Sequence, residues 1–223
     1  MRKLASAIPL YFCVLVLMLS TTLAFAQKRI PAGGIVWNYV GRVYINPATG
    51  TAQVAGYFTN FEGLGSLFAG PPSEATAYFT YRSDLLQLQP LPPQPDFNIT
   101  LAAAGKWHIY FNPVPAGNWN DLESFSHGQI VATLTHSTKE LIAAGPNGTS
   151  MFSGDLLSSA DFVLNGAKLN LHEIFPNGIT NFSTISSTPV SGTSDFPIAL
   201  PYAGSAIAKG PGPPTDSGSN EHR

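Results

Sequence analysis

The sequence has 223 residues, of which 11% are charged, and its formal net charge is −2 at pH 7. A typical soluble protein carries about 25% charged residues, and this chain has no cluster of Lys and Arg that could neutralise phosphates. The composition therefore argues against a nucleic-acid partner and against polybasic attachment to anionic lipid.

The first 26 residues have the pattern of a signal peptide. Arg2 and Lys3 give a positive start, residues 10–19 are apolar, and residues 24–26 fit a small-x-small cleavage site. The apolar run is shorter than the roughly 20 residues of a bilayer span. We therefore expect cleavage, no stable membrane anchor and an exported protein, secreted or periplasmic. The single cysteine, Cys13, lies inside this segment, so the mature chain would have no disulfide and no thiolate.

Beyond the signal peptide, the first half of the chain has the pattern of strands joined by turns. Residues 35–45 and 53–61 are rich in β-branched and aromatic residues and flank a turn signal at 46–50, which predicts a hairpin. Gly56 indicates a bulge or the close approach of another chain segment. Residues 75–82 alternate strictly between two faces, which predicts another strand.

The second half continues in the same way after a proline-rich segment. The prolines in residues 85–95 predict an extended surface connection outside any sheet. Further strands are expected at residues 97–104, 106–111, 128–136, 139–144, 149–157, 160–164, 167–175 and 178–185. Asn165-Gly166 and Asn177-Gly178 are turn signals between them. Within residues 153–163, one turn of helix also fits the pattern.

Together these segments predict a single all-β domain over residues 27–207, preceded by the signal peptide (1–26) and followed by a disordered polar tail (208–223). We expect about 8–10 mostly antiparallel strands in a β-barrel or a β-sandwich. The strand number is compatible with barrels that enclose an apolar ligand, such as lipocalin-like, dirigent-like and allene oxide cyclase-like barrels. The analogy concerns the fold alone and assigns no role to any residue of this chain.

Residues 110–128 depart most from the strand pattern and contain the candidate ligand-binding residues Trp119, Tyr110 and Asn118. A long loop that keeps large aromatics is usually ordered against a domain. The structural alternative is that Trp119 is buried against the end of the β-structure. In that case Trp119→Ala would cost about 3 kcal/mol or more.

The same loop contains the candidate catalytic residues Asp121, Glu123 and His127. Carboxylates beside a tryptophan suit sugar binding and glycoside hydrolysis, because the ring stacks on the sugar and the acids transfer protons. The competing and favoured interpretation is that Asp121 caps a turn while Trp119 pins the loop.

Metal, cofactor and modification signals are sparse. The five histidines show no metal-ligand spacing, so we expect no metal site and no cofactor, although strands can bring distant histidines together. Asn98, Asn147 and Asn181 each begin an N-x-[ST] pattern, which matters only in a host that glycosylates exported proteins.

The sequence favours a non-catalytic exported β-domain that binds a small apolar molecule, a glycan or a surface partner. Low charge, 11% aromatic residues and the lack of a catalytic motif support this expectation. One alternative is an enzyme, either isomerase- or cyclase-like within a barrel or glycan-active through Asp121 and Glu123. The other is a structural envelope protein. If the two loop carboxylates converge beside Trp119, sugar chemistry would be favoured. A filled core with no pocket would favour the structural envelope protein.

Overall fold

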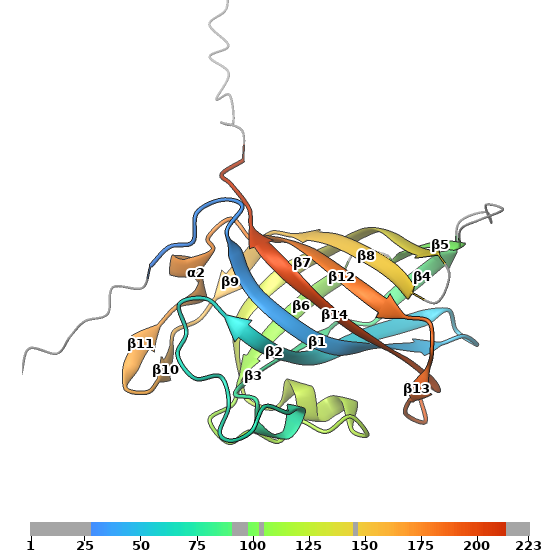
Figure 1. The fold of residues 1–223 in the computed structure, drawn as a ribbon, viewed down its shortest axis with the longest axis horizontal. Helices are drawn as coiled ribbons and strands as arrows, with labels where there is room; N and C mark the ends of the chain where they lie inside the picture. Colours follow the sequence, from blue (N-terminus) through green and yellow to red (C-terminus); the bar gives the residue numbers. More distant parts are fainter. Residues whose placement is uncertain (1–27, 91–97, 103–104, 145–146, 213–223) are drawn as a thin grey trace, which may run out of the picture.

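The computed structural model describes residues 28–90, 98–102, 105–144 and 147–212 (Figure 1). The predicted signal peptide and most of the predicted tail lie outside the described residues. The fold is all-β, as predicted, with a 12-stranded antiparallel sheet and a separate 2-stranded sheet.

The elements follow one another with short connections. In chain order they are β1 (Ile35–Asn46), β2 (Thr51–Phe61), η1 (Glu74–Thr76), β3 (Phe79–Ser83), β4 (Leu86–Pro90), β5 (Asn98–Ala102), β6 (Gly105–Phe111), η2 (Leu122–Ser126), β7 (Gln129–Ala144), β8 (Asn147–Gly154), β9 (Leu156–Ser159), β10 (Phe162–Leu164), β11 (Ala167–Leu169), α2 (Leu171–Ile174), β12 (Ile179–Ser186), β13 (Val190–Ser191) and β14 (Ile198–Ala208).

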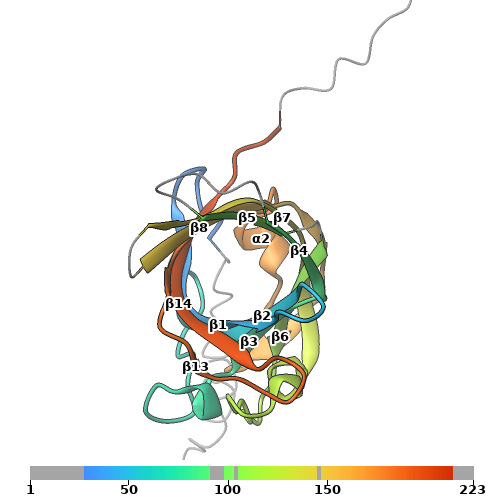
Figure 2. The same cartoon turned by 90° about the vertical axis from the view of Figure 1, so that its right-hand side faces the viewer.

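The large sheet curls into a barrel. β1 pairs with β14 on one side and with β2 on the other, and the pairings continue through β3, β6, β7, β8 and β12 back to β14. β4 and β5 link β2 to β7 farther along the same wall. Figure 2 looks into the ring of strands, with α2 at the far end. Of the two predicted architectures, the pairings therefore select the barrel.

Large aromatic side chains fill the interior near the end of the barrel that α2 covers. Trp37, fully buried, lies 5.1–5.2 Å between ring centroids from Phe58, Phe61 and Phe175, and 5.9 Å from Trp107. Leu171 and Ile174 of α2 join this core. Period-two alternation explains the arrangement, because every second residue of a strand points to the same face.

Glycines in the barrel wall make room for a tyrosine. Gly41 and Gly56 face each other across the β1–β2 pair, and a Cβ at either position would overlap the hydroxyl group of Tyr81. That hydroxyl donates to the carbonyl oxygen of Val40 (2.9 Å). The close approach predicted at Gly56 is confirmed.

The local turn signals are also confirmed. The β1–β2 hairpin turns where Asn46 Oδ1 accepts from the backbone N–H of Ala48 (3.0 Å). β10 and β11 form a hairpin through Asn165 and Gly166, both with positive φ (52° and 79°). These residue types tolerate the left-handed backbone that the turn requires.

Several predicted boundaries are wrong where tertiary pairing overrides local pattern. Residues 86–90, expected to lie outside the sheet, form β4, which ends at Pro90, so its earlier residues keep their N–H donors. The strand expected at 75–82 begins only at Phe79, after the 3-10 turn η1. The strands expected at 128–136 and 139–144 are one continuous strand, β7, because it pairs with β6 and then β5 along its length.

The short helix was predicted in the wrong place. Residues 153–163 contain parts of β8, β9 and β10 and no helix, whereas the strand expected at 167–175 is interrupted by α2. The Asn170 side chain caps α2 by accepting from the backbone N–H of His172 (3.0 Å). Such a cap favours a helical turn in a segment whose apolar residues also suit a strand.

β14, the strand between β1 and β12, has no counterpart among the strands predicted from the sequence. The strand contains Pro201, and proline lacks the N–H that a ladder needs. In the structure, Pro201 pairs with Arg42 of β1, while the pairing with β12 covers only the later residues of β14. Proline is therefore tolerated where this strand is paired on one side.

Candidate functional site

The loop between β6 and β7 is ordered against the outer wall of the barrel. Its residues Leu122 and Phe125 form a second apolar cluster with Tyr44, Ala55 and Ala199, which lie outside the barrel core. The Tyr44 hydroxyl donates to the carbonyl oxygen of Trp119 (3.1 Å), and the Thr80 hydroxyl to that of Phe125 (2.7 Å). The loop thus covers the outside of the wall instead of the end of the β-structure.

Trp119 is half-buried. Its ring lies 4.8 Å from Phe125 and 6.0 Å from Tyr57, measured between centroids. The guanidinium carbon of Arg42 lies 4.6 Å from the centroid of the same ring. These contacts occupy the ring, so it is poorly placed to stack on a sugar.

Trp119→Ala is expected to lower the free energy of unfolding by about 1–3 kcal/mol. Truncating a fully buried tryptophan costs about 3–5 kcal/mol, and this ring is only partly buried. Urea unfolding of the variant beside the wild type measures the difference. A loss of 4 kcal/mol or more, on the scale expected for full burial, would contradict the half-buried environment.

Tyr110 and Asn118, the other candidate ligand-binding residues, are not gathered around Trp119. Tyr110 pairs with Ile130 along the sheet, and its ring neighbour is His108 (6.2 Å between centroids). Burial raises the pKa of the Tyr110 hydroxyl. Asn118 is exposed, and its Oδ1 accepts from the backbone N–H of Asn120 (3.0 Å), which is a local turn contact.

The two carboxylates of the loop have structural contacts. Glu123 receives two hydrogen bonds from Arg82, from Nη1 at 2.5 Å and from Nη2 at 2.6 Å. These bonds lower the pKa of Glu123, so it is held as a carboxylate and is unsuited to act as a general acid. Asp121 caps η2 by accepting from the backbone N–H of Glu123 (3.1 Å), as the structural interpretation predicted. His127, the third candidate, is exposed directly after η2.

The described residues contain no group of three or more His, Cys, Asp or Glu side chains placed to hold a metal ion. His108 instead contacts Asp84 Oδ1 through Nε2 (3.1 Å) and Thr133 Oγ1 through Nδ1 (3.2 Å). His136 points into the barrel and stacks on Phe152 (4.6 Å between centroids).

Two of the three N-x-[ST] asparagines differ sharply in accessibility. Asn181 is 2% exposed, and its Nδ2 donates to the Tyr39 hydroxyl (2.5 Å) inside the barrel. Asn147 is exposed at the start of β8. The side chain of Asn98 is not among those that the structure describes. The folded protein thus presents Asn147, and not Asn181, to a modifying enzyme.

A groove that the sequence analysis missed lies on the outer face of β8, β12, β14 and β1. It has two adjoining parts, of about 540 Å³ and 480 Å³, which share Thr184 and Ala203. The first part is lined by Thr149, Ser150, Met151, Phe182, Ser183, Thr184, Ala203, Gly204 and Ser205. The second is lined by Val40, Gly41, Arg42, Trp119, Asn147, Thr184, Ser186, Pro201, Tyr202 and Ala203.

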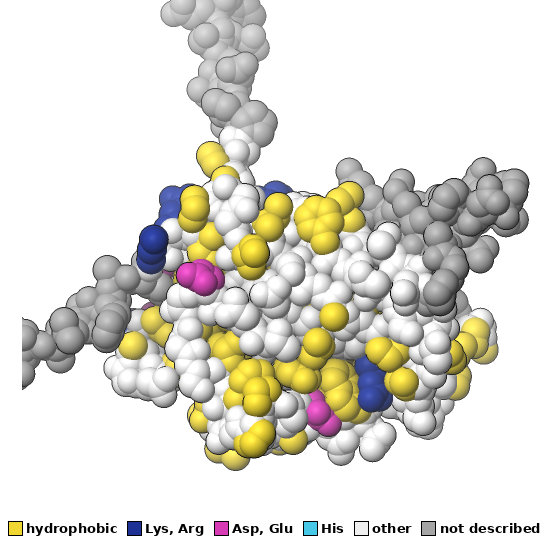
Figure 3. All heavy atoms as spheres, in the orientation of Figure 1, with side chains coloured by type: hydrophobic (Ala, Val, Ile, Leu, Met, Phe, Trp, Pro, Cys, Tyr) yellow, Lys and Arg dark blue, Asp and Glu magenta, His cyan; other side chains and the backbone are white. Residues whose placement is uncertain are grey.

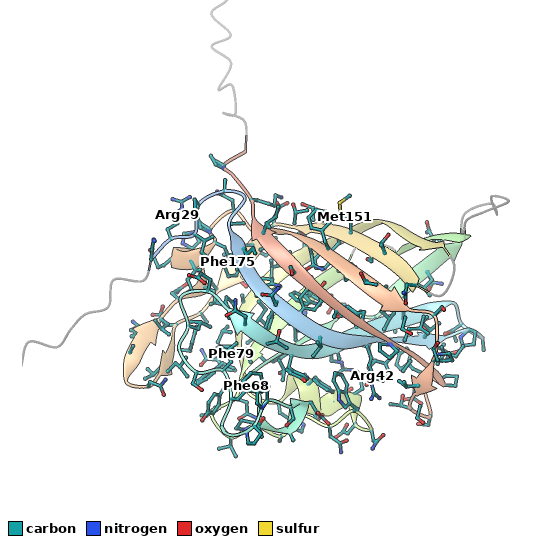
Figure 4. The ribbon with its side chains drawn as sticks, viewed as in Figure 1. Arg29, Arg42, Phe68, Phe79, Met151 and Phe175 are labelled. Carbon is teal, nitrogen blue, oxygen red and sulfur yellow. The ribbon has the colours of Figure 1, made fainter. Side chains whose placement is uncertain are left out.

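The lining is apolar or hydroxylated apart from the amide of Asn147 and one charged residue, Arg42. Met151 and Phe182 are about half exposed (46% and 47%) at one end, and Arg42 lies at the other. Figure 3 shows this face of the molecule, on which charged side chains are few, and Figure 4 labels Arg42 and Met151 on it. No local motif could have revealed the groove, because its four strands come from separate parts of the chain.

Arg42 is half-buried. Its Nη1 donates a long hydrogen bond to the carbonyl oxygen of Ser191 (3.4 Å). The ion pairs among the described residues join Arg82, His108, Lys168 and Lys209 to carboxylates, and none of them includes Arg42.

Comparison with known proteins gives no relative. No family model, curated protein or solved structure matches the chain. Within the part of the chain that the structure describes, no helix is long and apolar enough to cross a membrane. The chain is an antiparallel β-barrel, and two shallow adjoining depressions form the groove on its outer face.

Proposed function

We propose that this chain is an exported, non-catalytic β-barrel protein that binds a small, mostly apolar molecule on its outer face. The observation that supports the proposal is the two-part groove whose halves meet at Thr184 and Ala203. Small-molecule sites are typically concave and mostly apolar, with a few polar groups that orient the ligand. The groove has this composition, with hydroxyl groups along its floor and Arg42 at one end.

The packing of the barrel interior directs the proposal to the outer face. The rings around Trp37 and Trp107 occupy the interior near α2, and Tyr81 and Tyr39 extend this packing (5.7 Å between their centroids). A ligand in this part of the barrel would have to displace buried aromatic rings. The contacts of Asp121 and Glu123 also favour binding over glycan hydrolysis, because Arg82 already holds the Glu123 carboxylate.

Ala203→Trp is expected to abolish binding of a neutral, environment-sensitive dye such as Nile red. Ala203 is exposed and belongs to both parts of the groove, so an indole there would fill the floor without entering the barrel core. Fluorescence titration measures the affinity, and circular dichroism checks the fold. Ser158→Trp on β9 is the matched control, because it adds the same ring at an exposed strand position outside the groove.

Three outcomes of this titration are informative. Loss of binding in Ala203→Trp with normal binding in Ser158→Trp supports the groove. Equal binding by both variants and the wild type would place the ligand elsewhere. A wild-type protein that binds no dye would contradict the small-molecule function and favour a surface partner or the structural envelope alternative.

A further inference from the structure

The environment of Arg42 indicates what kind of molecule the groove accepts. A guanidinium group has five N–H donors in a rigid fork that matches carboxylate and phosphate groups. Among the described residues, Arg42 uses Nη1 for the bond to Ser191 and places its guanidinium over Trp119. It also lies close enough to Tyr44 to oppose the effect of burial, which raises the pKa of that hydroxyl. None of these contacts supplies a negative charge.

Among the described residues, Arg42 differs from Arg82 because no carboxylate is paired with it. Arg82, on the neighbouring wall, is paired with Glu123 through both terminal nitrogens. Half-buried Arg42 has no such pair among the described residues, and it is the one charged side chain in the lining of the groove. Removing a charge from water is unfavourable unless an opposite charge compensates. The groove is thus electrostatically complementary to one anionic group at this end.

The strand register gives the distance from this cation to the apolar end. Arg42 lies opposite Pro201 of β14, and Phe182 lies opposite Ser205 of the same strand. With about 3.3 Å per residue along a strand and about 4.8 Å between strands, the two positions are about 16 Å apart. Ala203 and Thr184 lie between them, and their short side chains leave space above the strands for a ligand.

We infer that the groove binds an acidic amphiphile, a molecule with one anionic head group and an extended apolar chain. This inference rests on the proposed function and specifies its ligand class. The head group accepts hydrogen bonds from the Arg42 guanidinium, which Trp119 holds in place. The chain lies over Ala203 and reaches the half-exposed side chains of Met151 and Phe182.

The test uses three probes with ten-carbon chains and different head groups: decanoate, methyl decanoate and decylammonium, the two ions below their micellar concentrations and the ester below its solubility limit. Isothermal titration calorimetry at low salt should show decanoate binding at least about tenfold more tightly than the ester, because hydrogen bonds to a charged group are strong. Decylammonium should bind most weakly. Added salt should weaken decanoate binding and leave the ester unchanged.

Arg42→Gln should remove the preference for decanoate over the ester, so that the two probes bind the variant with similar affinity. Lys106→Gln is the matched control, because it removes one positive charge from an exposed position on β6 and should keep the preference. Arg42→Lys retains the charge without the planar fork and should keep part of the preference. This variant also serves if Arg42→Gln does not fold.

The outcomes separate this inference from the proposed function. If decanoate and the ester bind the wild type equally, the anionic head group is wrong and the apolar groove stands. If the preference exists but persists in Arg42→Gln, Arg42 is not its source and the inference is also wrong. If none of the three probes binds the wild type, both the inference and the proposed function fail.

Discussion

Trp37→Ala is expected to lower the free energy of unfolding by about 3–5 kcal/mol, the usual cost of truncating a large buried aromatic residue. Trp37 is fully buried and contacts the rings of Phe58, Phe61, Trp107 and Phe175. Trp37 lies on β1, and the rings that it contacts come from β2, β6 and the segment after α2. Truncating Trp37 would remove these ring contacts and loosen the barrel at the end that α2 covers.

Trp37→Phe should cost far less than Trp37→Ala. The indole Nε1 of Trp37 is buried and has no hydrogen-bond partner. An unsatisfied buried donor costs about 1–3 kcal/mol, so removing it offsets part of the lost packing. Urea unfolding of both variants measures the comparison, and similar large losses in both would show that the indole ring is needed for its shape alone. A loss below 1 kcal/mol for Trp37→Ala would contradict the packed core altogether.

Acid should destabilise the protein through His136 before its carboxylates titrate. Burial lowers the pKa of His136 from 6.5 to about 4. Above about pH 6.5 the side chain is neutral in both the folded and the unfolded protein, so the full stability is present. As the pH falls below that value, the unfolded chain takes up a proton and the folded chain does not. The free energy of unfolding should therefore fall by about 2 kcal/mol between about pH 7.5 and 5.

His136→Leu should flatten this pH dependence, whatever its effect on the stability at neutral pH. Leu134→Val, which replaces a buried residue without a titratable group on the same strand, is the control and should retain the slope. The lowered pKa of Glu123 adds a loss of stability that begins lower, near the usual pKa of about 4 for carboxyl groups. Urea midpoints of the wild type, His136→Leu and the control variant, measured at several pH values, give the pH dependence of each. An unchanged slope in His136→Leu would assign the acid sensitivity to other groups.

The sequence by itself determined the all-β class and several local details of this protein. Strict alternation in strands and Asn-Gly turns are short-range signals, and they correctly located the β1–β2 and β10–β11 hairpins. The interpretation of Asp121 as a turn cap was also local, because it depends on a backbone N–H two residues away. Such features need no knowledge of distant partners, so they can be inferred from neighbouring residues alone.

Only the tertiary structure decided where the strands pair and where the groove lies. β4 and β14 contain prolines that locally disfavour strands, yet each finds partners from distant parts of the chain. Arg42 and Phe182 are far apart in sequence and belong to one groove because β14 lies between their strands. Likewise, only the structure shows that Glu123, a candidate catalytic residue, forms a salt bridge with Arg82. The physical reason is that barrel closure and cross-strand register depend on contacts between distant segments, which local propensity does not encode.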